Sequence, residues 1–129
     1  NDLFNRIEAD LHNLWPAVKK VNKARRSYPF AVINGEKKWL RGCDIEIDER
    51  RRLVEPRKQS RGEIARSMFY MAKRYGVEIH ARLEKTLKRW NRNDAVSATE
   101  RRRNDLIERL QVNRNPFIDD PRAVDHHRF

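Results

Sequence analysis

The chain has 129 residues, of which 38% are hydrophobic and 38% are charged. This length supports one domain with a modest core, and no apolar run approaches the roughly 20 residues of a membrane span. Lys and Arg number 30 against 19 Asp and Glu, so the formal net charge is +11. Such a charge favours a polyanionic partner, nucleic acid above all, although a basic solvated surface without a ligand has the same composition.

The remaining composition excludes several kinds of site. Cys43 is the single cysteine, so these residues form no disulfide among themselves. One cysteine and four scattered histidines leave no spacing typical of zinc, and neither a glycine-rich phosphate loop nor a nucleophile constellation is present. The chain begins at Asn1 without an initiating Met, inside what reads as a helix, which indicates a truncated or processed chain.

Residues 2–15 are predicted to form a helix, because apolar residues recur at intervals of three and four. Asp2 can cap its start, and Pro16 ends or bends it. Asn13 lies one position off the apolar stripe, at the edge of the core, where a cleft could form. From its position alone, the preferred interpretation is a satisfied Asn near a helix C-terminus. The stripe consists of Leu3, Phe4, Ile7, Leu11 and Leu14.

A small β element is predicted next. Two β-like runs, residues 28–33 and 39–47, flank Asn34 and Gly35, a pair typical of a hairpin turn. Residues 50–56 are then predicted to be a charged connection that leads to the helical half of the chain.

Three further helices are predicted after residue 56. Capping boxes of Ser60 with Glu63 and of Ser97 with Glu100 open two of them, which run to about residues 75 and 112. Gly76 stops the first, and another helix covers residues 78–91 between them.

The sequence therefore predicts an α+β fold, a mainly helical domain over residues 1–118 with one small β-hairpin. Residues 119–129 are predicted to be a polar tail whose end is mobile.

Several blocks match a known pattern in the correct order. Residues 8–16 match approximately E-S-D-hydrophobic-H/Y-N-L-x-P, with Ala9 in place of Ser, and residues 21–25 match V-N-x-x-R. The longest match is E-P…R-G-x-I-A-R-x-x-F-Y-M over residues 55–71. Residues 111–117 match Q-G-N-x-N-P-F/Y, except that Val112 stands in place of the usual Gly. With Trp90-Asn91 and Glu100-Arg101, these blocks resemble the bacterial endonuclease I family of ββα-metal (His-Me finger) nucleases.

The resemblance implies that the chain is the C-terminal part of such a nuclease and that Asn13 binds Mg²⁺ through its side-chain oxygen. The family's Glu-His motif, whose His is the general base and whose Glu is a second metal ligand, does not occur in this chain. It is expected in an upstream segment or a second chain. None of the histidines here is a convincing substitute base; they are His12, His80, His126 and His127.

By family position, Arg25, Arg61 and Arg66 are the first candidates for contact with the scissile phosphate. Arg61 and Arg66 also have a structural reading, in which they pair with Glu55 or Glu63. Arg101 begins a basic cluster at a helix start and is a fourth candidate for nucleic-acid binding, although most charge runs are solvated faces.

The function implied by the resemblance is Mg²⁺-dependent, sequence-nonspecific hydrolysis of DNA, with RNA as a second substrate, in the periplasm or outside the cell. The rival reading is a catalytically incomplete nucleic-acid-binding module. A basic interaction protein is a third, supported by net charge alone. No membrane association is expected.

Overall fold

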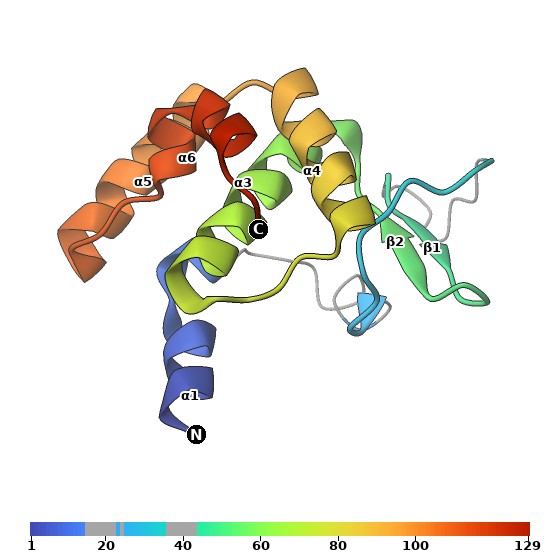
Figure 1. Ribbon diagram of the computed structural model, residues 1–129, viewed down its shortest axis with the longest axis horizontal. Coiled ribbons are helices and arrows are strands. Elements are labelled where there is room, and N and C mark those ends of the chain that lie inside the picture. Colours follow the sequence, from blue (N-terminus) through green and yellow to red (C-terminus); the bar gives the residue numbers. More distant parts are fainter. Residues whose placement is uncertain (15–22, 24, 36–43) are drawn as a thin grey trace. The chain divides into compact units, whose positions relative to one another are not determined.

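The computed structural model describes residues 1–14, 23, 25–35 and 44–129. The chain forms two compact units, one of residues 1–14 with 61–129 and one of residues 15–60 (Figure 1). Within the described residues, no helix is both long and apolar enough to cross a membrane.

The larger unit is helical. Its longest helix, α3 (Lys58–Tyr75), begins in the smaller unit, and in Figure 1 it lies between α4 and the pair α5 and α6. The core between them contains fully buried apolar side chains, including Phe69, Leu87 and Phe117. Burial of each such side chain contributes about 1.5–3 kcal/mol. The other helical elements are α1 (Asp2–Ala9), η1 (Leu11–Asn13), α4 (Ala81–Asn93), α5 (Ala98–Gln111), α6 (Pro116–Asp119) and η2 (Pro121–His126).

The predicted helix over residues 2–15 is wrong in its length and its cap. α1 stops at Ala9, its N-cap is Asn1 rather than Asp2, and η1 follows after the extended residue Asp10. Asp10 leaves the helix because its buried carboxylate accepts hydrogen bonds from distant donors. The predicted apolar stripe is also wrong for α1, since no residue of α1 is buried. Pro16 lies outside the described residues.

The start of α3 differs from the predicted capping box. The helix begins at Lys58, and the Ser60 hydroxyl accepts a hydrogen bond from Arg57 Nε at 2.8 Å. The Gly62 N–H donates to the Asp94 carboxylate at 2.8 Å. A Cβ at Gly62 would lie 2.4 Å from the Asp94 carbonyl oxygen, so this glycine allows the backbone at Asp94 to approach α3 closely. The predicted stop is confirmed, because α3 ends at Tyr75 and Gly76 has a φ of 68°.

The ends of α4 and α5 follow local signals only in part. α4 begins at Ala81, three residues later than predicted, with His80 at its N-cap. The Ser97 cap of α5 is confirmed, because its side chain accepts a hydrogen bond from the Glu100 N–H at 3.1 Å. α5 ends at Gln111, and Val112 follows with a φ of 66°, the left-handed conformation that a glycine adopts without strain.

The end of the chain, predicted to be a polar and mobile tail, is folded. Residues 116–126 form α6 and η2, in which Phe117, Ile118 and Val124 are buried. The ring of Phe129 lies 4.5 Å from that of Phe69, measured between centroids. Apolar residues spaced through a polar segment therefore pack it against α3.

In the smaller unit, β1 (Glu46–Asp48) pairs antiparallel with β2 (Leu53–Glu55). A mainly helical α+β fold with one small hairpin is thus confirmed. The described hairpin does not lie where it was predicted, because the partner of β1 comes from the segment interpreted as a charged connection, where Val54 is fully buried. Residues 39–43 of the predicted second run lie outside the described residues. Phe30 instead forms a parallel bridge with Val54. Residues 36–43, which include Cys43, lie outside the described part.

Candidate metal and nucleic-acid site

Asn13, the predicted metal ligand, lies at the end of η1 and is exposed. Its Nδ2 donates a long hydrogen bond of 3.4 Å to the carbonyl of Ile7. Among the described residues, its Oδ1 accepts no hydrogen bond. An amide oxygen that is exposed and without a donor fits one position in the oxygen shell that Mg²⁺ prefers. The described residues contain no group of three or more His, Cys, Asp or Glu that could hold a metal ion.

Side chains from two helices hold the turn that carries Asn13. Arg103 Nη2, from α5, donates to the carbonyl of Leu11 at 2.6 Å and also to that of Leu14. Ser67 Oγ, from α3, donates to the carbonyl of His12 at 2.8 Å. Residues on both sides of Asn13 are therefore fixed to the helical core, while its own side chain remains exposed.

Behind this turn, the Asp10 carboxylate is the centre of a buried polar network. It accepts hydrogen bonds from Tyr70 Oη at 2.7 Å, Tyr75 Oη at 2.6 Å and Gln111 Nε2 at 2.8 Å. It also accepts the His12 N–H at 2.9 Å. Burial opposes ionisation of Asp10, but the hydrogen bonds outweigh burial and the pKa of the carboxyl lies below its ordinary value. The carboxylate thus remains charged and anchors η1 to α3 and α5.

His12 is buried and faces away from solvent. Its Nε2 lies 3.1 Å from the carbonyl oxygen of Asn113, and since a carbonyl only accepts, Nε2 carries the hydrogen. Burial lowers the pKa of His12, so the ring is neutral near pH 7. Its side chain is 1% exposed and cannot meet a phosphate in solvent. His12 therefore supports the turn and is not the missing base.

Arg66 forms a closed structural pair instead of an open phosphate contact. It is fully buried, and its Nε and Nη2 donate to the two carboxylate oxygens of Glu100, each at 2.7 Å. Its Nη1 donates to Asn91 Oδ1 at 3.1 Å and to the Asp94 carbonyl at 2.8 Å. Its partner is Glu100, and neither Glu55 nor Glu63. This arrangement ties α3 to both α4 and α5, and we do not retain Arg66 as a phosphate ligand.

The other predicted arginines lie in different surroundings. Arg61 stacks with its guanidinium carbon 5.5 Å from the centroid of the Trp90 ring, and Arg101 is exposed in the first turn of α5. Arg25 belongs to the smaller unit, where it lies 4.2 Å above the ring of Phe30 and burial lowers its pKa. Of these three arginines, Arg61 and Arg101 lie in the same unit as Asn13.

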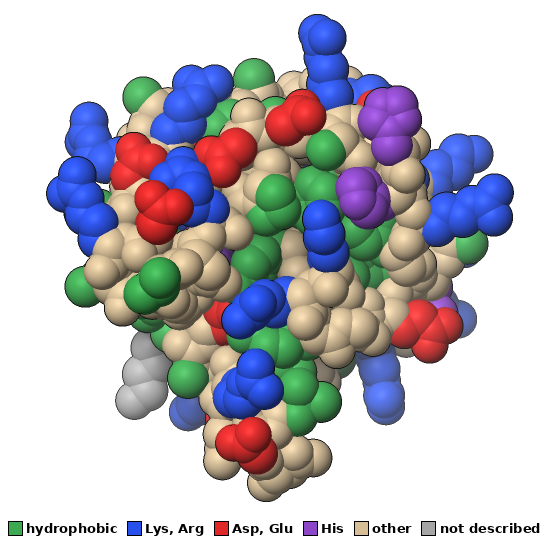
Figure 2. Space-filling model, turned by 60° about the vertical axis from the view of Figure 1, so that its left-hand side comes forward, with side chains coloured by type: hydrophobic (Ala, Val, Ile, Leu, Met, Phe, Trp, Pro, Cys, Tyr) green, Lys and Arg blue, Asp and Glu red, His purple; other side chains and the backbone are tan. Residues whose placement is uncertain are grey.

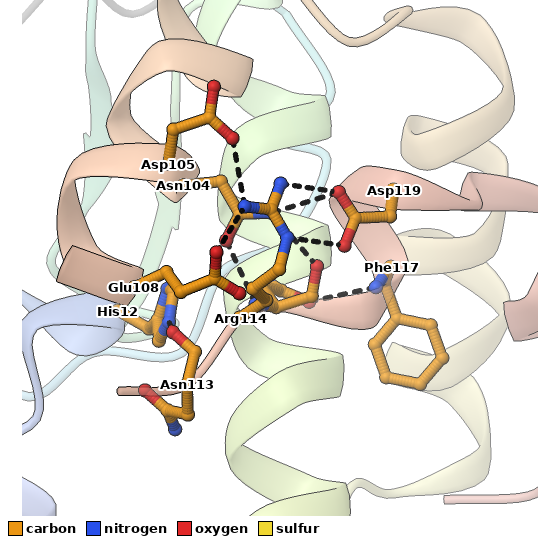
Figure 3. Close-up of polar contacts among 9 residues, drawn as sticks. His12, Asn104, Asp105, Glu108, Asn113, Arg114, Phe117 and Asp119 are labelled. Carbon is orange, nitrogen blue, oxygen red and sulfur yellow. Dashed lines mark hydrogen bonds and ion pairs between the residues drawn. The ribbon is translucent and has the colours of Figure 1, made fainter. Parts of the chain in front are cut away.

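The block over residues 111–117 has a structural role. Asn104 and Asn115 exchange hydrogen bonds, from the Asn115 N–H to Asn104 Oδ1 at 2.9 Å and from Asn104 Nδ2 to the Asn115 carbonyl at 3.2 Å. Arg114 meets three carboxylates, at 2.8 Å from Asp105, 3.4 Å from Glu108 and 2.7 Å from Asp119 (Figure 3). Hydrogen bonds from Arg114 keep the pKa of Asp119 below its ordinary value. The block fixes the reversal of the chain between α5 and α6.

Sequence reasoning missed several residues that support the site, among them Asp10, Arg103 and Gln111. Asp10 and Gln111 belong to matched sequence blocks. A match along the sequence does not show which distant residues these side chains contact. Arg103 was grouped with Arg101 in a surface cluster, although it is half-buried. In the expected helix through residue 15, the Leu11 carbonyl would have accepted a hydrogen bond from within the helix, which hid the need for a distant donor to it.

The chain is similar to known nucleases over most of its length. A model of the family described as Endonuclease I matches residues 3–122. An extracellular deoxyribonuclease of Aeromonas hydrophila is 39% identical over 120 residues, which cover 92% of this chain and 52% of that protein. Endonuclease-1 of Buchnera aphidicola subsp. Acyrthosiphon pisum (strain APS) is 34% identical, over 89% of this chain and 46% of that protein.

An extracellular ribonuclease of Bacillus amyloliquefaciens is 37% identical, over 90% of this chain and 45% of that protein. The chain therefore spans about half the length of these relatives. The matched residues include the turn of Asn13, all of α3 and the reversal after α5, and they confirm the resemblance. The chain belongs to the Endonuclease I family.

Proposed function

We propose that this chain is part of a metal-dependent endonuclease that hydrolyses phosphodiester bonds of DNA without sequence specificity, with RNA as a second substrate. The relatives are named deoxyribonuclease, endonuclease and ribonuclease, and the net charge of +11 suits a polyphosphate substrate. Relatives of the chain are named extracellular deoxyribonuclease, periplasmic deoxyribonuclease and extracellular ribonuclease, so we also propose a periplasmic or secreted location.

The observation that carries the proposal is the exposed side chain of Asn13 on a turn that is fixed from both sides. An oxygen ligand held in this way is preorganised, so little ordering is needed when Mg²⁺ binds. Bound Mg²⁺ would stabilise the charge that develops on the phosphorane and on the leaving 3′ oxygen. Asn13 would supply one protein oxygen, and a carboxylate from outside this chain a second.

The reaction is a displacement at phosphorus by water. The water loses a proton to a general base, its oxygen bonds to phosphorus, and the bond to the 3′ oxygen breaks. His12, which adjoins Asn13, does not suit the role of base because its ring is buried away from solvent. We therefore propose that the base is a His of an upstream segment or of a second chain. Arg61 and Arg101 would contact the backbone phosphates, and we keep Arg25 as a third such contact.

The test is nicking of a supercoiled plasmid by the protein with Mg²⁺ and with EDTA. We expect cleavage that EDTA abolishes and that Asn13→Ala lowers on the order of a hundredfold or more. The matched control is Asn93→Ala, which removes the same amide from the exposed last residue of α4. Equal cleavage by both variants would exclude Asn13 as a ligand.

The second candidate is a nucleic-acid-binding module without its own catalysis. It is favoured by the burial of His12, the histidine that adjoins Asn13 in the described part of the chain. DNA binding without Mg²⁺-dependent cleavage, in a preparation that contains every segment of the mature protein, would support this candidate over the nuclease.

A further inference from the structure

Helix α4 carries a row of basic side chains, none of which was among the predicted nucleic-acid contacts. Arg82, Lys85, Arg89 and Arg92 follow one another at intervals of three, four and three residues, and all four are exposed. At 100° per residue, they lie within an arc of about 80° on the helix, and they extend over about 15 Å. We call these four residues the α4 face.

The α4 face has almost no neutralising charge within the described residues. Arg82, Lys85 and Arg89 have no side-chain partner there. Arg92 pairs with Asp125 at 3.3 Å, but both side chains are about half exposed, and such a pair contributes little. The one carboxylate of α4 belongs to Glu84, which is half-buried and already engaged by Lys88 at 3.7 Å and by the Phe129 N–H at 2.8 Å.

The opposite side of α4 is firmly packed. Leu87, Trp90 and Asn91 are buried, and Asn91 Nδ2 donates to the carbonyl of Pro121 at 2.9 Å. The row of cations thus lies on a helix that is held in place, so their backbone positions are set before any ligand binds. Like charges three and four residues apart destabilise a helix by a few tenths of a kcal/mol per pair. An anionic ligand along the face removes this repulsion.

We propose that the α4 face binds the sugar–phosphate backbone of the nucleic-acid substrate, as a surface additional to Arg25, Arg61 and Arg101. A row of about 15 Å can meet two or three successive phosphates of one strand. Guanidinium groups bind phosphate through two parallel hydrogen bonds, and three of the four residues are arginines. These contacts do not distinguish one base from another, so binding is independent of the nucleotide sequence. The inference rests on the proposed action on nucleic acid, and it does not depend on the metal or the base.

The test measures binding of a fluorescein-labelled 20-base-pair DNA duplex by anisotropy, in EDTA, over a series of NaCl concentrations. The variant Arg82→Gln/Lys85→Gln/Arg89→Gln removes three charges from the α4 face. The control Arg6→Gln/Arg50→Gln/Arg109→Gln removes three charges from exposed positions on three other segments. All six side chains are exposed, so both variants are expected to keep the melting temperature of the parent.

Each lost phosphate contact lowers the slope of log K against log salt by about 0.9. We expect the α4 variant to lose two to three contacts, with affinity lower on the order of 30- to 150-fold at 0.15 M salt, and the control to lose less than one. Equal slopes for the two variants would overturn the role of the α4 face and leave the proposed nuclease intact. Failure of the parent protein to bind the duplex would overturn both.

Discussion

Two arginine-centred regions of the helical unit use the same side chain in opposite ways. Around Arg66 the guanidinium is enclosed, and its donors meet Glu100, Asn91 and the backbone at Asp94 inside the core. Around Arg103 the guanidinium binds two backbone carbonyls at the edge of the unit, next to an exposed Asn13. The closed region joins three helices, whereas the open region positions a side chain and leaves it free to bind. The comparison separates arginines that stabilise the fold from arginines that support a site.

The largest effect is expected from breaking the closed pair. Arg66→Ala leaves the Glu100 carboxylate buried without its cation, so the free energy of unfolding should fall by about 3–5 kcal/mol. Urea denaturation followed by circular dichroism measures this loss. The double variant Arg66→Met/Glu100→Leu should lose less than the single variant, because no uncompensated charge remains. A double variant that is less stable than Arg66→Ala would contradict this account of the pair.

A smaller effect on stability, confined to the turn, is expected at the open region. Arg103→Gln removes the donor to Leu11 and Leu14, each bond contributing about 0.5–1.5 kcal/mol. Hydrogen exchange of the Asn13 and Leu14 amides should accelerate about tenfold, since about 1.4 kcal/mol of local opening energy corresponds to that factor. Arg102→Gln, exposed on the same helix, is the control and should leave both rates unchanged.

The smallest effect depends on pH and comes from His12. Burial lowers the pKa of His12 in the folded protein, so the unfolded chain binds a proton first as pH falls below its ordinary value of about 6.5. Stability should therefore decrease as the pH falls below about 6.5, and His12→Gln should remove this part of the decrease. The measurement is the urea midpoint at each pH. His80→Gln, at an exposed position, should behave as the parent does. A parent and a His12→Gln variant with parallel pH profiles would show that His12 is protonated equally in both states.

The features that the sequence predicted correctly are those decided by neighbouring residues. The cap at Ser97 and the stop at Gly76 depend on one turn of chain, and both are confirmed. The resemblance to the family was likewise recognised from residues that are close together in the sequence and from the order of the matched blocks along the chain. By contrast, the end of α1 is decided by donors to Asp10 that lie 60 to 101 residues away, and no local pattern contains them.

The same reasoning explains the errors at the β element and at Arg66. Asn34 and Gly35 are residues that favour a turn. Strand pairing, however, depends on which segment can bury its side chains, and Val54 is completely buried. Glu63 is the near neighbour of Arg66 in the sequence, but Glu100 reaches it through the packing of α5 on α3. Sequence alone therefore located the candidate residues and left their partners undetermined.

The ties around Asn13 also have a consequence for the order of events during synthesis. Its turn is held by Ser67, Arg103 and Gln111, and the last of these leaves the ribosome some hundred residues after the turn itself. Contacts between residues so far apart in the chain form late in folding. A nascent chain that stops short of residue 111 lacks side chains that hold the turn of Asn13, the proposed metal ligand. The proposed nuclease would thus acquire its site only after residue 111 has been synthesised, so that shorter nascent chains would remain inactive toward the nucleic acids of the cell.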